Sequence, residues 1–216
     1  MARAWSWVLW GLVLAVALAV AAKFAPMARA QAPAVDGLVL NEILAGPARD
    51  WDGDGAFDAR GDEWLEVANG GSVALDLSLY RVADADSTIR YAFTGLLLPG
   101  DVAMVSGTAA LEWQRAEGRP ATGLSLNNAG DTVHLFRVEG ADTVLVDVKA
   151  YNAIEGGSDR STGRLGAGWI LFDSLNPYGG SGEPQGTGCA PTPGGENGCT
   201  TPVTETTWGW IKAHYR

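Results

Sequence analysis

Short apolar or alternating segments recur along the chain about every ten to fifteen residues, and Gly, Asn, Asp and Pro separate them. Such segments are typical of strands, and their connections are too short for repeated βαβ crossovers. The pattern therefore predicts an all-β fold, an antiparallel sandwich or barrel. The expected strands span residues 38–44, 63–69, 77–85, 88–93, 101–106, 132–138, 144–151 and 168–172.

Segment 144–149 shows the alternation most clearly, with the sequence Val-Leu-Val-Asp-Val-Lys. Successive side chains of a strand point to opposite faces, so the three valines fall on one face and the charged residues on the other. Because antiparallel sheets commonly have one buried and one solvated face, we expect the valines to be buried and Asp147 and Lys149 to lie in water.

Two other local patterns are distinct from the strands. Residues 108–118 have helical character, with apolar residues ahead of Gly118, a residue that commonly ends helices. Residues 127–131, Asn-Asn-Ala-Gly-Asp, are expected to form a turn, because Asn and Gly tolerate positive φ and Asp can bond the local backbone.

The N-terminal residues have the composition of a targeting segment. Arg3 precedes an apolar run over residues 4–22, and small residues follow it in two arrangements that suit signal peptidase. Residues 1–30 are therefore expected to be a signal peptide, and the same run is long enough to span a bilayer as an uncleaved anchor. Either interpretation predicts an exported protein, secreted or associated with the cell envelope.

The charge balance excludes some partners. The chain has 216 residues and a net charge of −10, which becomes −13 when Arg3, Lys23 and Arg29 are removed with the signal peptide. Nucleic-acid binding depends on clustered Lys and Arg, so no nucleic-acid partner is expected. Contact with a membrane is expected only through the N-terminal segment, if that segment is not cleaved.

The two cysteines, Cys189 and Cys199, predict a disulfide, because an even number of cysteines in an exported chain is usually paired. The bridge would close a small loop and stabilise it by about 2–3 kcal/mol. The alternative is a pair of reduced thiols. Zinc is not expected, since no His or further Cys lies nearby to complete four ligands.

The segment between the first two expected strands is dense in Asp and Gly. Counted from Asp50, it reproduces the first half of a calcium loop, in which oxygen ligands alternate before a Gly at the sharp turn. Position 12 is Gly61, so the usual glutamate is missing and Asp62 or Glu63 is the expected substitute. The candidate ligands for a structural Ca²⁺ are Asp50, Asp52, Asp54, Ala56 through its carbonyl, Asp58, Asp62 and Glu63.

The alternative is a solvated Asp/Gly turn that binds no ion. If the site is ordinary for an extracellular protein, the expected dissociation constant is on the order of 10⁻⁴–10⁻³ M. The neighbouring Asn41, Glu42 and Glu66 are expected to be structural. A Glu that faces inward needs a partner, for which Arg164 is the candidate.

Six short motifs follow one another in a fixed order. They are Leu-Asn-Glu-Ile at 40–43, Asp-Glu-Trp-Leu-Glu-Val-Ala-Asn at 62–69, Val-Ala-Leu-Asp-Leu-Ser at 73–78, Leu-Pro-Gly-Asp at 98–101, Leu-Asn-Asn-Ala-Gly-Asp-Thr-Val-His-Leu at 126–135, and Ser-Thr-Gly-Arg at 161–164 followed by Trp169. Together they resemble the motifs of the bacterial lamin tail domain family. The resemblance implies an immunoglobulin-like β-sandwich over residues 37–178, and an exported binding or scaffold module without catalytic residues.

The residues after this region differ in composition. Residues 179–200 are rich in Gly, Pro, Ser and Thr and are expected to be a wrapped coil or a linker that contains the disulfide loop. Residues 201–216 are expected to be a short amphipathic helix or a sorting segment, since Trp208, Ile211 and Tyr215 share helical spacing.

The expected function is therefore a non-catalytic adhesion or scaffold module with a protein or polysaccharide partner at the cell surface. One alternative is a small secreted hydrolase that uses the acidic loop for a catalytic metal. Another is a carbohydrate-binding module with an aromatic face made by Trp51, Trp64 and Trp169. A nucleophile elbow of the G-x-S-x-G type does not occur in the sequence.

Overall fold

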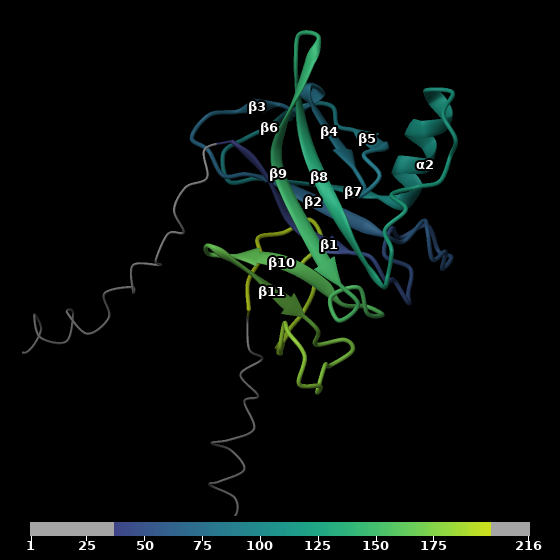
Figure 1. Cartoon of the computed structure of the whole chain (residues 1–216), viewed down its shortest axis with the longest axis vertical. Helices are drawn as coiled ribbons and strands as arrows, with labels where there is room; N and C mark the ends of the chain where they lie inside the picture. The colour runs from purple at the N-terminus through teal and green to yellow at the C-terminus, as the bar shows by residue number, and fades with distance from the viewer. Residues whose placement is uncertain (1–36, 200–216) are drawn as a thin grey trace, which may run out of the picture. The chain divides into compact units, whose positions relative to one another are not determined.

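Two mainly antiparallel sheets pack face to face in the part of the chain that this computed structural model describes, residues 37–199 (Figure 1). The larger sheet has the strand order β12-β11-β10-β1-β2-β7, and the smaller has the order β5-β4-β8-β9. A third, two-stranded sheet is formed by β3 and β6. The expected signal peptide, residues 1–30, and the expected tail, residues 201–216, lie outside the described residues.

The larger sheet is formed by β1 (Leu38–Leu44), β2 (Trp64–Asn69), β7 (Val102–Ser106), β10 (Ser161–Leu165), β11 (Gly168–Phe172) and β12 (Gly186–Cys189). The smaller sheet is formed by β4 (Tyr80–Ala83), β5 (Ile89–Ala92), β8 (Gly130–Glu139) and β9 (Asp142–Asn152). The two-stranded sheet is formed by β3 (Leu75–Asp76) and β6 (Leu96–Leu97). The pairings are antiparallel except for that of β11 with β12, which is parallel.

The core lies between the two sheets. Leu40 and Val67 of the larger sheet and Val82 and Leu135 of the smaller one belong to one buried cluster. Alternate residues of β1, β2, β4 and β8 point into this layer, which is the arrangement expected of a β-sandwich. The predicted all-β sandwich is therefore confirmed.

One helix in the described residues, α2 (Gly107–Ala116), follows β7 and confirms the helical pattern seen in the sequence. The side chain of Ser106 accepts a hydrogen bond from the Ala109 amide and caps the first turn. Gly118, with φ of 65°, follows the last turn and supplies the left-handed conformation that commonly ends a helix.

The faces of β9 are the reverse of the prediction. Val144, Val146 and Val148 are between 38% and 45% exposed, whereas the carboxylate of Asp147 faces inward. Asp147 accepts hydrogen bonds from the Leu40 amide and from Arg164, at 2.9 and 2.7 Å, so its burial is compensated. The prediction was wrong because buried partners on other strands can outweigh the hydropathy of one strand.

The C-terminal extension also differs from the prediction. Part of it forms β12 beside β11, so it is neither a linker nor wholly coil. Asp173, just after β11, accepts hydrogen bonds from the amides of Tyr178, Thr187 and Gly188 and fixes the course of the extension. The extension therefore packs as a cover on the outer side of the larger sheet.

Candidate metal centre

The acidic loop between β1 and β2 is anchored at its start by a single carboxylate, that of Asp159. Its Oδ1 accepts hydrogen bonds from the Ala48 amide and from Trp51 Nε1, each at 2.9 Å. Its Oδ2 pairs with Arg49 at 3.0 Å. The ring of Trp51 lies 5.9 Å from that of the buried Trp64, so the loop also rests on the sheet.

The end of the loop is held against the first turn of α2. The Gly107 amide donates to the Glu63 carbonyl at 2.7 Å, and the Thr108 amide donates to the Gly61 carbonyl at 3.0 Å. A Cβ at Gly107 would lie 1.7 Å from the Arg60 carbonyl oxygen, so the approach requires glycine. Both ends of the loop are therefore fixed on rigid elements.

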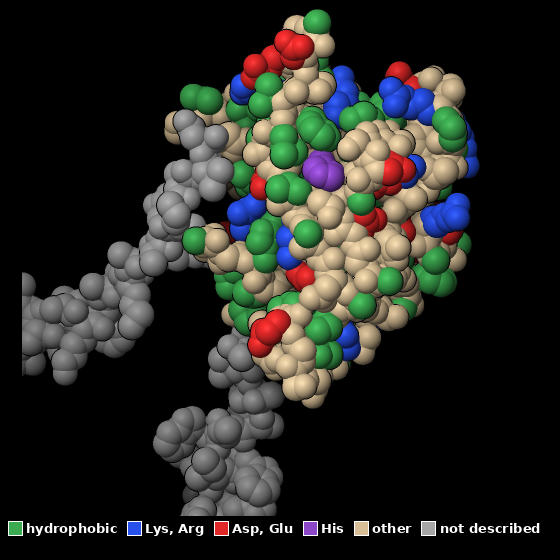
Figure 2. All heavy atoms as spheres, in the orientation of Figure 1, with side chains coloured by type: hydrophobic (Ala, Val, Ile, Leu, Met, Phe, Trp, Pro, Cys, Tyr) green, Lys and Arg blue, Asp and Glu red, His purple; other side chains and the backbone are tan. Residues whose placement is uncertain are grey.

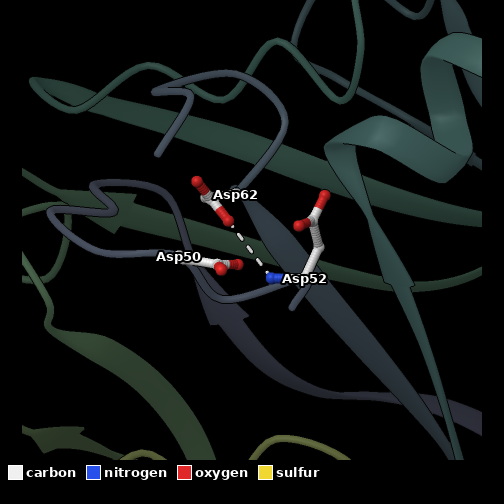
Figure 3. A group of neighbouring side chains, drawn as sticks. All are labelled: Asp50, Asp52 and Asp62. Carbon is white, nitrogen blue, oxygen red and sulfur yellow. Dashed lines mark hydrogen bonds between the residues drawn. The ribbon is translucent and has the colours of Figure 1, made fainter. Parts of the chain in front are cut away.

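Three of the predicted ligands converge in this loop. Ligand oxygens of Asp50, Asp52 and Asp62 lie within 4.8 Å of one another (Figure 3). Asp62 is buried, Asp52 is half-buried and Asp50 is exposed. The three carboxylates approach one another at the surface of the protein, where solvent and ions have access.

Backbone amides orient these carboxylates. Asp62 Oδ1 accepts from the Trp51 and Asp52 amides at 2.6 and 3.1 Å, and Oδ2 accepts from the Asp58 amide at 2.8 Å. Asp50 accepts from the amides of Gly53 and Gly55 at 2.6 and 2.9 Å. A carboxylate oxygen has two lone pairs, so Asp62 Oδ2 and both oxygens of Asp50 accept one amide and can still coordinate a cation, whereas Asp62 Oδ1 already accepts two amides.

The other predicted carboxylate ligands lie outside this cluster. Asp54 and Asp58 each accept a hydrogen bond from the amide two residues further on, those of Ala56 and Arg60. Glu63 points away from the loop, and its Oε2 accepts from the Leu126 amide at 3.2 Å. Burial raises the pKa of Glu63 to about 8. The structure therefore brings together three of the six predicted carboxylate ligands.

The geometry of the three carboxylates suits a single hard cation. Ca²⁺ binds oxygen ligands at about 2.3–2.6 Å, so two oxygens on one ion lie at most about 5 Å apart. The observed limit of 4.8 Å is within this span. The acidic cluster could hold a metal ion, with its further ligands supplied by water or by other oxygens of the loop.

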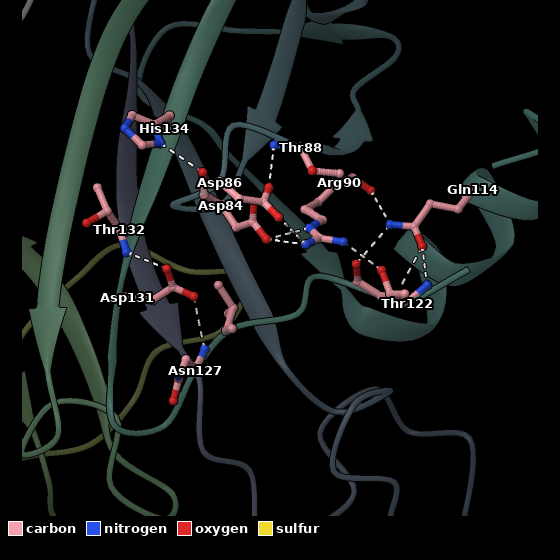
Figure 4. A network of polar contacts seen from close by, with 12 residues as sticks. Asp84, Asp86, Thr88, Arg90, Gln114, Thr122, Asn127, Asp131, Thr132 and His134 are labelled. Carbon is pink, nitrogen blue, oxygen red and sulfur yellow. Dashed lines mark hydrogen bonds and ion pairs between the residues drawn. The ribbon is translucent and has the colours of Figure 1, made fainter. Parts of the chain in front are cut away.

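A second polar network lies between the smaller sheet and α2 (Figure 4). Arg90 pairs with the buried Asp84, whose pKa is raised by burial, and it also lies 3.7 Å from Asp86. A hydrogen bond with Asp84 lowers the pKa of Asp86 to about 2. Gln114 donates to the Arg90 and Gly123 carbonyls, each at 2.8 Å. The network joins helix, sheet and loop. Its hydrogen bonds and ion pairs are those of a structural support.

A third polar group lies on the outer face of the larger sheet. Glu42 and Glu66 are directly opposite each other on β1 and β2, and both are fully buried. Arg164, the expected partner of such a glutamate, pairs with Asp147 instead, so that prediction was wrong. Glu42 bonds Thr192, and Glu66 bonds the Gly194 amide, so residues of the C-terminal extension replace the expected cation.

The chain matches the sequence model of one protein family. A model described as Lamin Tail Domain matches residues 31–153, which include β1 to β9 and the acidic loop. The chain belongs to the lamin tail domain family. Lamin tail domains are immunoglobulin-like and non-enzymatic, and such a domain fits a binding or scaffold module. Neither a curated protein nor a solved structure matched the chain.

In this lamin tail domain the three tryptophans do not form an aromatic binding face. Trp64 is completely buried under Trp51. Trp169 packs against the core, with Lys149 and Arg164 over its ring at 5.0 and 4.8 Å. The arrangement removes the observation on which the carbohydrate-binding alternative depended.

The predicted disulfide is present in the C-terminal extension, after the region that the family model matches. Cys189 at the end of β12 is bonded to Cys199, with their Cα atoms 4.9 Å apart. A disulfide is compatible with an extracellular location. Among residues 37–199, the helix is too short and too polar to cross a membrane.

Several residues that shape these sites give no signal in the sequence. Asp159 contacts the acidic loop from more than 100 positions away, and Thr192 and Gly194 contact Glu42 and Glu66 from at least 128 positions away. Single polar residues in Gly- and Pro-rich segments form no motif by themselves. Their roles follow only from the folded structure, and all three lie after the region that the family model matches.

Proposed function

We propose that this protein is an exported, non-catalytic lamin tail domain that binds or organises a partner at the cell surface, as an adhesion or envelope-associated scaffold. In this proposal a structural Ca²⁺ stiffens the loop between β1 and β2. The observation that carries the cation is the approach of three carboxylates, those of Asp50, Asp52 and Asp62, within 4.8 Å.

The electrostatics of the loop support a bound cation. Three carboxylates at this separation repel one another, and a divalent ion would convert the repulsion into attraction. Arg49, which directly precedes Asp50 in the sequence, is engaged by Asp159. The loop is already ordered by its own hydrogen bonds, so binding needs little rearrangement and chiefly adds rigidity.

The position of the cluster favours a structural role over a catalytic one. A catalytic metal keeps an open position inside a pocket that excludes water, whereas this loop lies at the surface and Asp50 is exposed. The proposed partner is a protein or a polysaccharide. The acidic charge of the whole chain, −10, opposes binding to nucleic acid.

Thermal unfolding of the full-length protein tests the cation. With a dissociation constant on the order of 10⁻⁴–10⁻³ M, 10 mM CaCl₂ stabilises the folded state by about 1.4–2.7 kcal/mol, or about 3–10 °C in Tm. EDTA is expected to reverse the shift. Asp52→Asn is expected to abolish it, because the amide keeps an acceptor for the Asp54 backbone but loses the charge.

The matched control is Asp142→Asn, which removes one exposed aspartate at the start of β9. This variant should show the same Ca²⁺ shift as the wild type. A wild-type Tm that is unchanged by both CaCl₂ and EDTA would contradict the proposed site. Export and the partner are tested separately, by mass spectrometry of the mature N-terminus and by capture of partners from envelope fractions.

A further inference from the structure

The segment between the two cysteines, residues 190–198, lies across the outer face of the larger sheet and is called the strap here. Thr192 donates to Glu42 through its amide at 3.2 Å and through its hydroxyl at 2.6 Å. The Gly194 amide donates to Glu66 Oε1. Two backbone amides of the strap therefore donate hydrogen bonds to two carboxyl groups of the sheet.

The fit between strap and sheet is close. Asn197 donates to the carbonyls of Asn41 and Arg164, each at 2.9 Å, and so bonds to both β1 and β10. A Cβ on Gly163 would lie 2.9 Å from Asn197 Nδ2 and 2.4 Å from the ring of Phe172. The absence of a side chain at Gly163 lets Asn197 reach the sheet.

The two carboxyl groups under the strap are an unfavourable pair when both are charged. Glu42 and Glu66 are Cα partners on adjacent strands, and like charges directly opposite each other destabilise a sheet. Burial raises the pKa of Glu42, and it raises the pKa of Glu66 to about 7. Hydrogen bonds from Ser161 and Thr192 to Glu42 oppose this shift and do not cancel it.

The charged groups around the pair do not neutralise it. In the part of the chain that the structure describes, neither glutamate forms an ion pair, because Arg164 on β10 is bound to Asp147 and Lys149 on β9 is bound to Glu155. The strap itself carries a further acidic residue, Glu196. On the other side, β7 places Met104 opposite Glu66.

We propose that the strap is a proton-sensitive latch. It lies closed over Glu42 and Glu66 while at least one of them is protonated, and it lifts when both are ionised. Opening would expose two glutamates, Asn41 and Ser161 on a sheet face that is otherwise covered. The latch is independent of the acidic loop, and it does not require a bound cation.

The direction of the pH dependence follows from linkage. Glu66 binds its proton more tightly when the strap is closed, so closing is fully favoured below the ordinary pKa of 4.5. As the pH rises from 4.5 to about 7, the open state ionises first and closing is progressively lost. Above about pH 7, Glu66 is ionised in both the open and the closed state, so its contribution to the closing equilibrium no longer changes with pH.

Amide hydrogen exchange of the full-length protein tests the latch, after correction for the intrinsic exchange rate at each pH. Protection of the Thr192 and Gly194 amides is expected to fall on the order of ten- to seventyfold between pH 5 and pH 8, because the shift at Glu66 sets that limit. The Leu135 amide, in the centre of β8, should keep its protection over the same range.

Two substitutions separate the latch from general effects of pH. Glu66→Gln should reduce the fall to less than a third of the wild-type value, because two charges can no longer coexist under the strap. Glu42→Gln should act in the same direction and serves as the second variant if Glu66→Gln fails to fold. Glu139→Gln, which changes an exposed glutamate on β8, should behave like the wild type.

Two results would overturn the proposal. One is wild-type protection at Thr192 and Gly194 that does not change with pH. The other is a fall in protection in both Glu66→Gln and Glu42→Gln that is as large as in the wild type. That result would assign the pH dependence to other groups.

Discussion

Asp159 shows how much one side chain fixes in this domain. It follows the turn between β9 and β10, and it accepts hydrogen bonds from the Ala48 amide, the Trp51 indole and the Arg49 guanidinium. Asp62 acts in the same way from within the loop, because it accepts three backbone amides. The candidate cation site is thus positioned by two carboxylates, of which only Asp62 belongs to it.

Gly107 is the residue on which the other end of the loop depends. Replacing it with alanine places a methyl group 1.7 Å from the Arg60 carbonyl oxygen, which forces the loop and α2 apart. We expect Gly107→Ala to lower the free energy of unfolding by about 1–3 kcal/mol in urea denaturation.

Gly168→Ala is the control for this change, because a Cβ at Gly168 meets no atom within 4 Å and its φ is not positive. Its effect should stay within about 0.5 kcal/mol. If the two variants were equally stable, the close approach at Gly107 would have no energetic consequence.

At the residue scale the sequence predicts the acidic loop better than its ligands. The spacing of Asp50 and Asp52 indicates the cluster, and the structure brings both together with Asp62. The sequence also explains why only one of Asp62 and Glu63 faces the cluster. Neighbouring residues at the start of a strand point to opposite sides. Glu63 accordingly meets the Leu126 amide.

Strand β9 illustrates how tertiary partners decide which face of an element is buried. Its outer face carries valines beside His134 and Phe136 of β8, whose rings stack with centroids 5.8 Å apart. Figure 2 shows hydrophobic side chains around the single described histidine on this face. Its inner face carries Asp147 and Lys149, each in an ion pair.

A matched pair of substitutions checks this assignment. Val148→Thr, on the exposed face of β9, is expected to change the free energy of unfolding by less than about 0.5 kcal/mol. Val133→Thr, on the buried face of β8, is expected to lower it by about 1–3 kcal/mol, because the new hydroxyl is buried in an apolar layer. Equal effects in urea denaturation would contradict the assigned faces.

At the element scale, strands with strong patterns are predicted well. The strands at 38–44, 102–106 and 168–172 form almost as expected, since their apolar residues are dense. Strand β10, Ser-Thr-Gly-Arg-Leu, gives no strand pattern, because its outer face is covered by the strap and not by apolar side chains. Strand β12 also gives no strand pattern, because its sequence, Gly-Thr-Gly-Cys, contains no large apolar residue.

The whole described molecule has more layers than a two-sheet sandwich. The C-terminal extension adds a cover to the larger sheet, and the Cys189–Cys199 bond ties the end of that cover to β12. Composition predicts the disulfide but not the cover, because the contacts join residues more than 100 positions apart. The family match ends at residue 153, so the cover follows the matched region.

Removing the disulfide should loosen this cover. The double variant Cys189→Ala/Cys199→Ala is expected to lose about 2–3 kcal/mol in urea denaturation, because the open chain gains conformational entropy when it unfolds. Wild-type protein treated with a reductant should lose a similar amount. A loss below about 0.5 kcal/mol in both samples would mean that the surrounding hydrogen bonds alone hold the extension.

The inward-pointing charges of β9 have a consequence for behaviour in concentrated solution. β9 is the outermost strand of its sheet, it is 11 residues long, and it displays valines. A strand of this kind is an open template for chain-to-chain pairing and fibril growth. The register of β9 against β8 is irregular next to Leu135, and such an irregularity bends an edge strand. Asp147 and Lys149 add inward-pointing charges to this edge, each held in an ion pair. Bulges and inward-pointing charges are two of the features that protect exposed edge strands from pairing with another chain.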